Sequence, residues 1–236
     1  MTDRTIETSP RLKARIAGVL YLVSGTLFVR GMPVVTGDAA ATAHKILEHE
    51  TLFRLGFVAE LMSSPLYIAV TLLLYILLRP VNKSLSLLAA FFSLAGSIIG
   101  ALTSLFHLAP VLVLGGSHYL KVFNVDQLQA LALMFLNLHT QGLDISMIFF
   151  GFYCLLIGYL ILKSTFLPRI IGALLMIAGL CYLINYSATF IAPQFAAHLV
   201  PYILIPGLAE IVLALWLLVM GLNTERWKEQ AGARMS

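Results

Sequence analysis

The stretch QGLDISMIFFGFYCLLIGYLIL, residues 141–162, decides the fold class of this chain. After Asp144 it holds no charged side chain, and its length falls in the range of about 17–25 residues that a helix needs to cross a bilayer. His139 stands two residues before it, in the polar segment NLHTQGLD. The stretch therefore predicts a membrane-spanning helix with polar groups at its entrance.

Apolar runs of this kind recur along the chain and predict an all-α polytopic membrane protein with six transmembrane helices. Hydrophobic residues make up 60% of the 236 residues and charged residues only 11%. No polar segment is long enough to fold as a separate domain. The expected spans cover residues 12–35, 52–78, 85–114, 141–162, 168–191 and 200–222.

The polar segments outside these spans are short. We expect a cytoplasmic tail at residues 1–11, one membrane domain at 12–222 and a second cytoplasmic tail at 223–236. Between the first two spans, Asp38 can cap a short surface helix. Asp126 can cap another helix, which either lies in the membrane interface or extends the following span.

The distribution of basic residues predicts the orientation. Eleven of the fifteen lysines and arginines fall in residues 1–15, 79–83, 163–169 and 223–236. Because cytoplasmic loops carry an excess of Lys and Arg, both termini are expected in the cytoplasm, with the protein in the cell (inner) membrane. The lipid bilayer is its expected partner, and the net charge of +4 requires no nucleic acid.

Two patterns indicate three related helical hairpins. Small residues seven positions apart occur in the outward-going helices, which predicts close helix packing: Gly18 and Gly25, Ala89 and Gly96, Gly172 and Gly179. Each inward-going helix carries one carboxylate near its outer end: Glu60, Asp144 and Glu210.

Polar residues of the spans gather in their outer part, and they are the candidate ligand-binding groups. An ionisable side chain inside a bilayer is costly unless it is paired or hydrated. We therefore expect Arg30 and Glu60 to pair, since consecutive spans are neighbours. The alternative is structural, because the positive end of a helix dipole stabilises an anion by about 0.3–1 kcal/mol without any function. The full candidate set is Arg30, Glu60, Asp144, Asn185 and Glu210.

A zinc site is the one cofactor site for which the sequence offers ligands. His107, His139 and Asp144 have the residue types that bind zinc. They are not accompanied by a His-x-x-x-His or His-Glu-x-x-His pair. Cys154 and Cys181 both fall inside spans and are expected to be core residues rather than a disulfide.

The segment Arg15-Ile16-Ala17-Gly18-Val19-Leu20-Tyr21-Leu22 follows a short basic tail and opens the six-span domain. With this arrangement the chain resembles, over nearly its whole length, the bacterial membrane family catalogued as domain of unknown function 4386. The resemblance implies an uncharacterised multi-pass bacterial membrane protein and assigns no catalytic residue.

Three functions are compatible with these patterns. The first is binding or transport of a small solute or ion through an outward-facing polar site; with only six spans, alternating access would call for a homo-oligomer. The second is a structural or regulatory membrane protein without a ligand site. The third is a membrane-embedded metal-dependent hydrolase with Glu60 or Glu210 as its base.

Overall fold

The computed structural model describes residues 9–28, 38–199 and 204–233, and within them the secondary structure is helical. The elements are α1 (Pro10–Phe28), α2 (Ala39–Glu48), α3 (Glu50–Leu78), α4 (Lys83–Leu114), the 3-10 helix η1 (His118–Val122), α5 (Val125–Lys163), α6 (Arg169–Ile191), α7 (Pro193–Leu199), α8 (Leu204–Val219) and α9 (Thr224–Gly232). The predicted all-α fold is confirmed.

Four of these helices, α3, α4, α5 and α6, are long and apolar enough to cross a membrane. A fifth span is reached if α8 and α9, which meet at a bend of 100°, count as one. The described parts of the chain thus contain four or five candidate spans, whereas the sequence predicts six. The first expected span corresponds to α1, which has 19 residues and begins in the basic segment.

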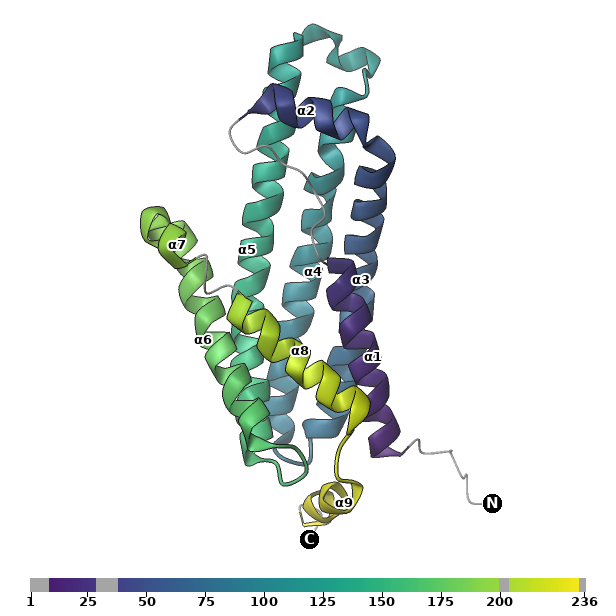
Figure 1. The fold of residues 1–236 in the computed structure, drawn as a ribbon, viewed down its shortest axis with the longest axis vertical. Coiled ribbons are helices and arrows are strands. Elements are labelled where there is room, and N and C mark those ends of the chain that lie inside the picture. The colour runs from purple at the N-terminus through teal and green to yellow at the C-terminus, as the bar shows by residue number, and fades with distance from the viewer. Residues whose placement is uncertain (1–8, 29–37, 200–203, 234–236) are drawn as a thin grey trace, which may run out of the picture.

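The helices form a closed ring. Contacts join α1 to α3, α3 to α4, α4 to α5, α5 to α6, α6 to α8, and α8 back to α1. In Figure 1, α3, α4 and α5 run side by side along the long axis, and α8 crosses obliquely between α6 and α1. Near the upper end α2 lies across these helices, below the connection between α4 and α5. The start of α1 and the whole of α9 lie together at the lower end.

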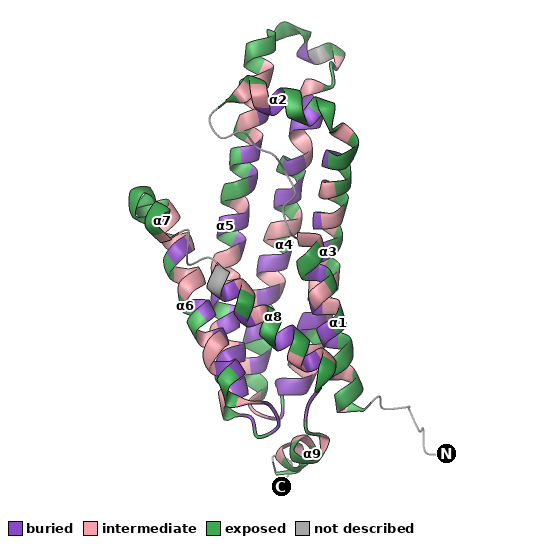
Figure 2. Ribbon diagram, viewed as in Figure 1, coloured by how far each residue is buried: buried purple, intermediate pink, exposed green. Residues whose placement is uncertain are grey.

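The outer surface of the ring is apolar. Exposed large hydrophobic side chains occur on every long helix, for example Leu72, Phe91, Leu102 and Ile184, each more than half exposed. Figure 2 shows exposed residues, in green, on α1, α3, α5, α6 and α8. A water-soluble protein does not expose apolar surface on this scale, so the surface indicates insertion into a membrane.

Glycines bring the helices of the ring close together. A Cβ on Gly179 of α6 would lie 2.7 Å from the carbonyl oxygen of Gly151 of α5, and one on Gly172 would lie equally close to that of Gly158. A Cβ on Gly18 of α1 would lie 2.5 Å from the backbone nitrogen of Leu218 of α8. Packing seams of small residues, predicted from the spacing of seven, are confirmed at these positions.

Hydroxyl groups connect neighbouring helices. Ser63 of α3 donates to the carbonyl of Ser24 in α1, at 2.9 Å. The hydroxyls of Thr71 in α3 and Ser93 in α4 lie 2.6 Å apart. Ser146 of α5 donates to the carbonyl of Gly96 in α4, at 2.8 Å. Such bonds satisfy polar groups that cannot find water in the interior of a membrane protein.

Three local predictions have different outcomes. Asp38 caps α2 by accepting from the backbone N–H of Ala41, as predicted. Asn124, and not Asp126, caps α5. The Asn124 side chain accepts from the backbone N–H of Gln127, and the Gln127 side chain accepts from the backbone N–H of Asn124, which together form a capping box. The segment before residue 141 extends α5 rather than forming a separate helix.

The C-terminal polar segment contains a helix, which its composition alone did not indicate. This helix, α9, is anchored by the indole N–H of Trp227, which donates to the carbonyl oxygen of Leu77 at 2.8 Å. Leu77 lies in the last turn of α3. The indole N–H thereby supplies a hydrogen bond to a carbonyl in the last turn of a helix, where carbonyl groups have no partner within the helix.

Candidate functional site

Three buried side chains of metal-ligand type meet where α3, α4 and α5 run side by side (Figure 1). Nε2 of His139 lies 2.7 Å from Oε1 of Glu60. Nδ1 of His107 lies 2.8 Å from Oε2 of the same carboxylate. One ligand atom from each of the three residues lies within 4.8 Å of the other two. We call these residues, Glu60, His107 and His139, the Glu-His-His cluster.

The cluster lies at one level of the molecule because α4 runs antiparallel to α3 and α5 (Figure 1). Glu60 is 18 residues from the lower end of α3, and each histidine is 24 residues from the lower end of its helix. At 1.5 Å per residue these separations correspond to about 27–36 Å. Residues far apart in the sequence therefore converge near the same height.

Apolar side chains cover the cluster on the side of α2. The ring of Phe53 packs edge-on against His107, with ring centroids 4.7 Å apart. Phe53 belongs to a small apolar group with Ile46 of α2, Val111 of α4 and Leu136 of α5. Together they shield the cluster from the end of the molecule where α2 lies.

Within the described residues, the hydrogen bonds of the cluster do not satisfy all of its buried polar atoms. Oε1 of Glu60 accepts from the hydroxyl of Ser104 as well as contacting His139. Nε2 of His107 is buried without a hydrogen-bond partner in the described parts of the chain. Buried polar atoms are nearly always paired, so a network that serves only to join helices would be expected to satisfy this nitrogen.

The cluster has the chemistry of a divalent transition-metal site. Two imidazoles and one carboxylate form a common zinc ligand set, and three protein ligands leave a fourth position for water or a solute. Tetrahedral ligands at 2.0–2.1 Å from zinc are about 3.4 Å apart. The present contacts of 2.7 and 2.8 Å are hydrogen-bond distances, so the carboxylate would separate from each imidazole by about half an ångström to admit an ion.

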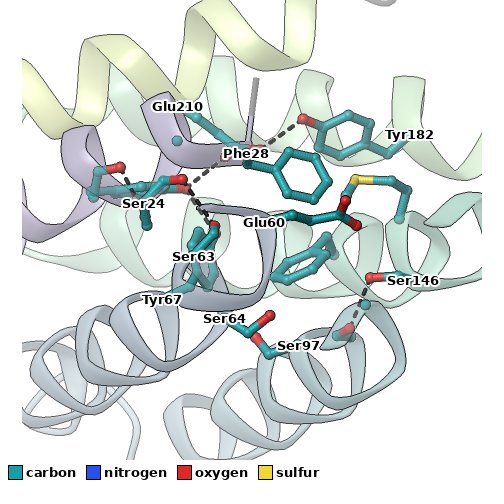
Figure 3. Close-up of a pocket in the computed structure, with 16 residues that line it drawn as sticks. Ser24, Phe28, Glu60, Ser63, Ser64, Tyr67, Ser97, Ser146, Tyr182 and Glu210 are labelled. Carbon is teal, nitrogen blue, oxygen red and sulfur yellow. Dashed lines mark hydrogen bonds between the residues drawn. The ribbon is translucent and has the colours of Figure 1, made fainter. Parts of the chain in front are cut away.

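A cavity of about 120 Å³ lies inside the helix ring and adjoins the cluster (Figure 3). All six helices of the ring contribute to its lining, and Glu60 belongs both to the cluster and to the lining. Its polar groups are two carboxylates and several hydroxyls. The lining includes Tyr21, Ser24, Phe28, Glu60, Ser63, Ser64, Tyr67, Ser97, Ser146, Phe150, Tyr182 and Glu210.

Glu210 of α8 forms a second polar group at this cavity. Tyr21 donates its hydroxyl to Oε2 at 3.0 Å, and Tyr182 donates to Oε1 at 2.9 Å. Figure 3 shows Tyr182 pointing from α6 toward Glu210. The thiol of Cys154 also contacts Oε1, at 3.8 Å. A carboxylate from α8 is thus held by side chains from α1, α5 and α6.

The structure brings together some of the predicted site residues and separates others. Glu60 and Glu210 line one cavity, and His107 and His139 join Glu60. Asp144 is buried on α5 outside both the Glu-His-His cluster and the lining. Asn185 is buried on α6 and is likewise outside them. Arg30, the predicted partner of Glu60, lies outside the described residues.

The sequence did not reveal Tyr21 and Tyr182, whose hydroxyls hold Glu210, or Tyr67, whose hydroxyl lies 3.0 Å from that of Tyr21. Tyr21, Tyr67 and Tyr182 occur inside apolar runs rather than at their ends, where tyrosines usually anchor a helix to the interface. A phenol in such a position needs a buried hydrogen-bond partner, and this was the available signal. Cys154 gave no signal, because a cysteine in an apolar helix resembles any small core residue.

Comparison with known proteins gives a family but no activity. The family model described as "Domain of unknown function (DUF4386)" matches residues 16–221. An uncharacterized protein of Archaeoglobus fulgidus is 29% identical over 154 residues, which cover 65% of this chain and 76% of that protein. No solved structure matches the chain.

Proposed function

This chain belongs to the family described as Domain of unknown function (DUF4386), and we propose that it binds a divalent transition-metal ion of the zinc class within the membrane. The observation that carries this proposal is the Glu-His-His cluster. Three ligand atoms from three helices lie within 4.8 Å of one another, in the described part of the chain, and all three residues are buried. The ion is held by Glu60, His107 and His139.

The ion site is accessible to a small solute in the cavity. Glu60 lines the central cavity as well as the cluster, so an ion held by this carboxylate borders the cavity. Three protein ligands leave one tetrahedral position free, and a solute in the cavity can reach it. The protein accordingly acts as an ion- and solute-binding membrane protein, with the cavity as its polar site.

The proposal includes six spans in a cell membrane, with both termini in the cytoplasm. The six helices of the ring are α1, α3, α4, α5, α6 and α8. The turns at the lower end carry Arg79, Lys83, Lys163 and Arg169, as a cytoplasmic surface should. A hydrocarbon core of about 30 Å that begins at these turns ends near the height of Glu60. The metal site then lies at the outer boundary of the membrane.

Metal content of the purified protein tests the site. After loading with zinc and desalting, detergent-purified wild type should retain about one ion per chain, as measured by plasma mass spectrometry. Glu60→Gln and His139→Ala should retain at least tenfold less, because each removes one of three ligands. Zinc should also raise the melting temperature of wild type and not of these variants.

The matched control is Asp144→Asn, which removes a buried carboxylate of the same helix as His139 that is not one of the three cluster residues. This variant should retain zinc at the wild-type level. If wild type retains no more zinc than Glu60→Gln does, the cluster is a hydrogen-bonded helix junction, and the structural alternative replaces the metal site.

A second candidate function, metal-dependent hydrolysis, is favoured by the identity of the ligands. Two histidines and one glutamate with an open fourth position are also the ligands of zinc hydrolases, in which the ion activates a water molecule. The same preparations distinguish the two functions. Zinc-loaded wild type that releases product from a chromogenic ester, where Glu60→Gln does not, would identify a hydrolase; binding without turnover leaves a binding protein.

A further inference from the structure

We infer that the Glu210 end of the central cavity binds a small organic ammonium ion. This inference goes beyond the metal site, because it concerns a different carboxylate, held by different helices. Glu210 lies on α8 and is held by Tyr21 of α1 and Tyr182 of α6. The Glu-His-His cluster lies on α3, α4 and α5.

In its ionised form Glu210 requires a partner of opposite charge. Its carboxylate oxygens meet two hydroxyls and one thiol, all of them neutral donors. Among the described residues no lysine, arginine or histidine forms an ion pair with it. A carboxylate placed inside a membrane protein is costly without a counter-charge. A cation in the cavity supplies that charge where Glu210 borders it.

The carboxylate also has room for one more donor. An ionised carboxylate offers about four lone-pair positions, and the three neighbouring donors occupy no more than three of them. The N–H of a protonated amine can fill the remaining position. A metal ion is a poorer fit, because each of these three neighbours already directs a hydrogen toward the carboxylate.

Aromatic rings form part of the cavity lining and suit an organic cation. Tyr21 and Tyr67 meet edge to face, with ring centroids 5.2 Å apart, and Tyr67 meets Phe150 in the same way at 5.0 Å. These rings and Phe28 line the cavity. The faces of aromatic rings attract alkylammonium groups through their quadrupoles. The aromatic rings can therefore contact the alkyl chain of an organic ammonium ion, while Glu210 binds its charged nitrogen.

The volume limits the size of the ligand. An engineered protein cavity of about 150 Å³ accommodates benzene, and this cavity measures about 120 Å³. The ligand is therefore an amine of about four to six non-hydrogen atoms. An anion fits the Glu210 end less well, because the ionised carboxylate of Glu210 repels it.

Thermal unfolding of the detergent-purified full chain tests the inference, with n-propylammonium chloride as the probe. At saturation the probe should raise the melting temperature of wild type by about 5 °C, as selective binding to the folded state requires. The neutral isostere 1-propanol and an equal concentration of potassium chloride should not. Glu210→Gln should lose the shift, because it removes the charge.

A second variant guards against a folding defect in Glu210→Gln. Gly25 lines the cavity, and a Cβ there would meet nothing within 4 Å among the described residues. Gly25→Val should therefore fold, fill part of the cavity and lose the ammonium shift, while it retains zinc. The inference is overturned if wild type shows no ammonium-specific shift, or if Glu210→Gln or Gly25→Val keeps it.

The metal site and the ammonium site can be tested independently of each other. Wild type stripped of metal with a chelator should keep the ammonium shift, since no residue of the Glu-His-His cluster contacts Glu210 in the hydrogen bonds described. If zinc does not bind and the shift persists, only the metal site is wrong. If zinc binds and ammonium produces no shift, only the present inference is wrong.

Discussion

Glu60 illustrates, at the scale of single residues, how one carboxylate can serve two states. Without an ion it accepts hydrogen bonds from two imidazoles, one at each oxygen. With an ion the same nitrogens must present lone pairs, so His107 and His139 bind as neutral imidazoles facing the metal. Metal binding thus exchanges two hydrogen bonds for three coordinate bonds and releases any proton that occupied a ligand nitrogen.

This exchange predicts that zinc affinity depends on pH. Protons and zinc compete for the same nitrogens of His107 and His139, because an imidazole nitrogen binds a metal only when it carries no proton. The dissociation constant for zinc should therefore rise by more than roughly tenfold when the pH falls from 7.5 to 5.5. Calorimetric titration at the two pH values measures this. An affinity that does not change would mean that the ion binds to carboxylates alone.

At the scale of helices, the same spacing of small residues has two different uses. Gly172 of α6 packs against Gly158 of α5, and Gly179 of α6 packs against Gly151 of α5. Gly151 and Gly158 are also seven residues apart, and the backbones of the two helices are in direct contact at both pairs. Gly25 has the same spacing from Gly18, yet it faces the cavity rather than a neighbouring helix. A small residue there leaves space for a ligand.

The close approach of α5 and α6 predicts a large effect of a single methyl group. A Cβ on Gly179 would lie 2.7 Å from the carbonyl oxygen of Gly151, and the backbone there cannot yield without moving the helix. Gly179→Ala should lower the free energy of unfolding by about 1–3 kcal/mol, the usual cost of overpacking. Unfolding of the purified protein in mixed micelles measures the change.

Gly100→Ala is the control for this effect, because its Cβ would meet the hydroxyl oxygen of Ser146 at 3.6 Å, an ordinary contact. It should be neutral or stabilise the protein by up to about 1 kcal/mol, since alanine favours a helix more than glycine does. Equal destabilisation by both variants would show that the loss of stability does not come from the close approach of α5 and α6 at Gly179.

At the scale of the whole molecule, helix length and membrane thickness do not match. The 39 residues of α5 extend about 58 Å, nearly twice the hydrocarbon thickness of about 30 Å. The upper part of α5, together with α2 and η1, therefore projects beyond the hydrocarbon core when the lower turns lie at the other surface. The projecting part covers the Glu-His-His cluster and gives this end of the molecule its own apolar packing.

The proposed orientation predicts which surface positions can be labelled from outside the cell. Lys121 in η1 and Lys228 in α9 are both exposed and lie at opposite ends of the molecule. In a background with Cys154 and Cys181 replaced by alanine, Lys121→Cys should react with a membrane-impermeant maleimide in intact cells. Lys228→Cys should react only after permeabilisation. The reverse pattern would place both termini outside.

The chain sequence by itself determined the class of the protein, both ends of three of its long helices and most of the ionisable residues of the site. The ends of α3, α4 and α6 lie within two residues of the predicted span ends, because apolar runs stop where charged residues and turn formers begin. Glu60, His107, His139 and Glu210 could be named as site residues because a polar group in an apolar run is costly.

Only the tertiary structure decided which of these residues meet. Glu60 contacts His107, 47 residues away, and His139, 79 residues away, while Asp144, only five residues from His139, is outside the cluster. Such convergence depends on how each helix is rotated and shifted against its neighbours. Rotation and shift are set by close backbone contacts between different helices, and the hydropathy of a single span carries no information about them.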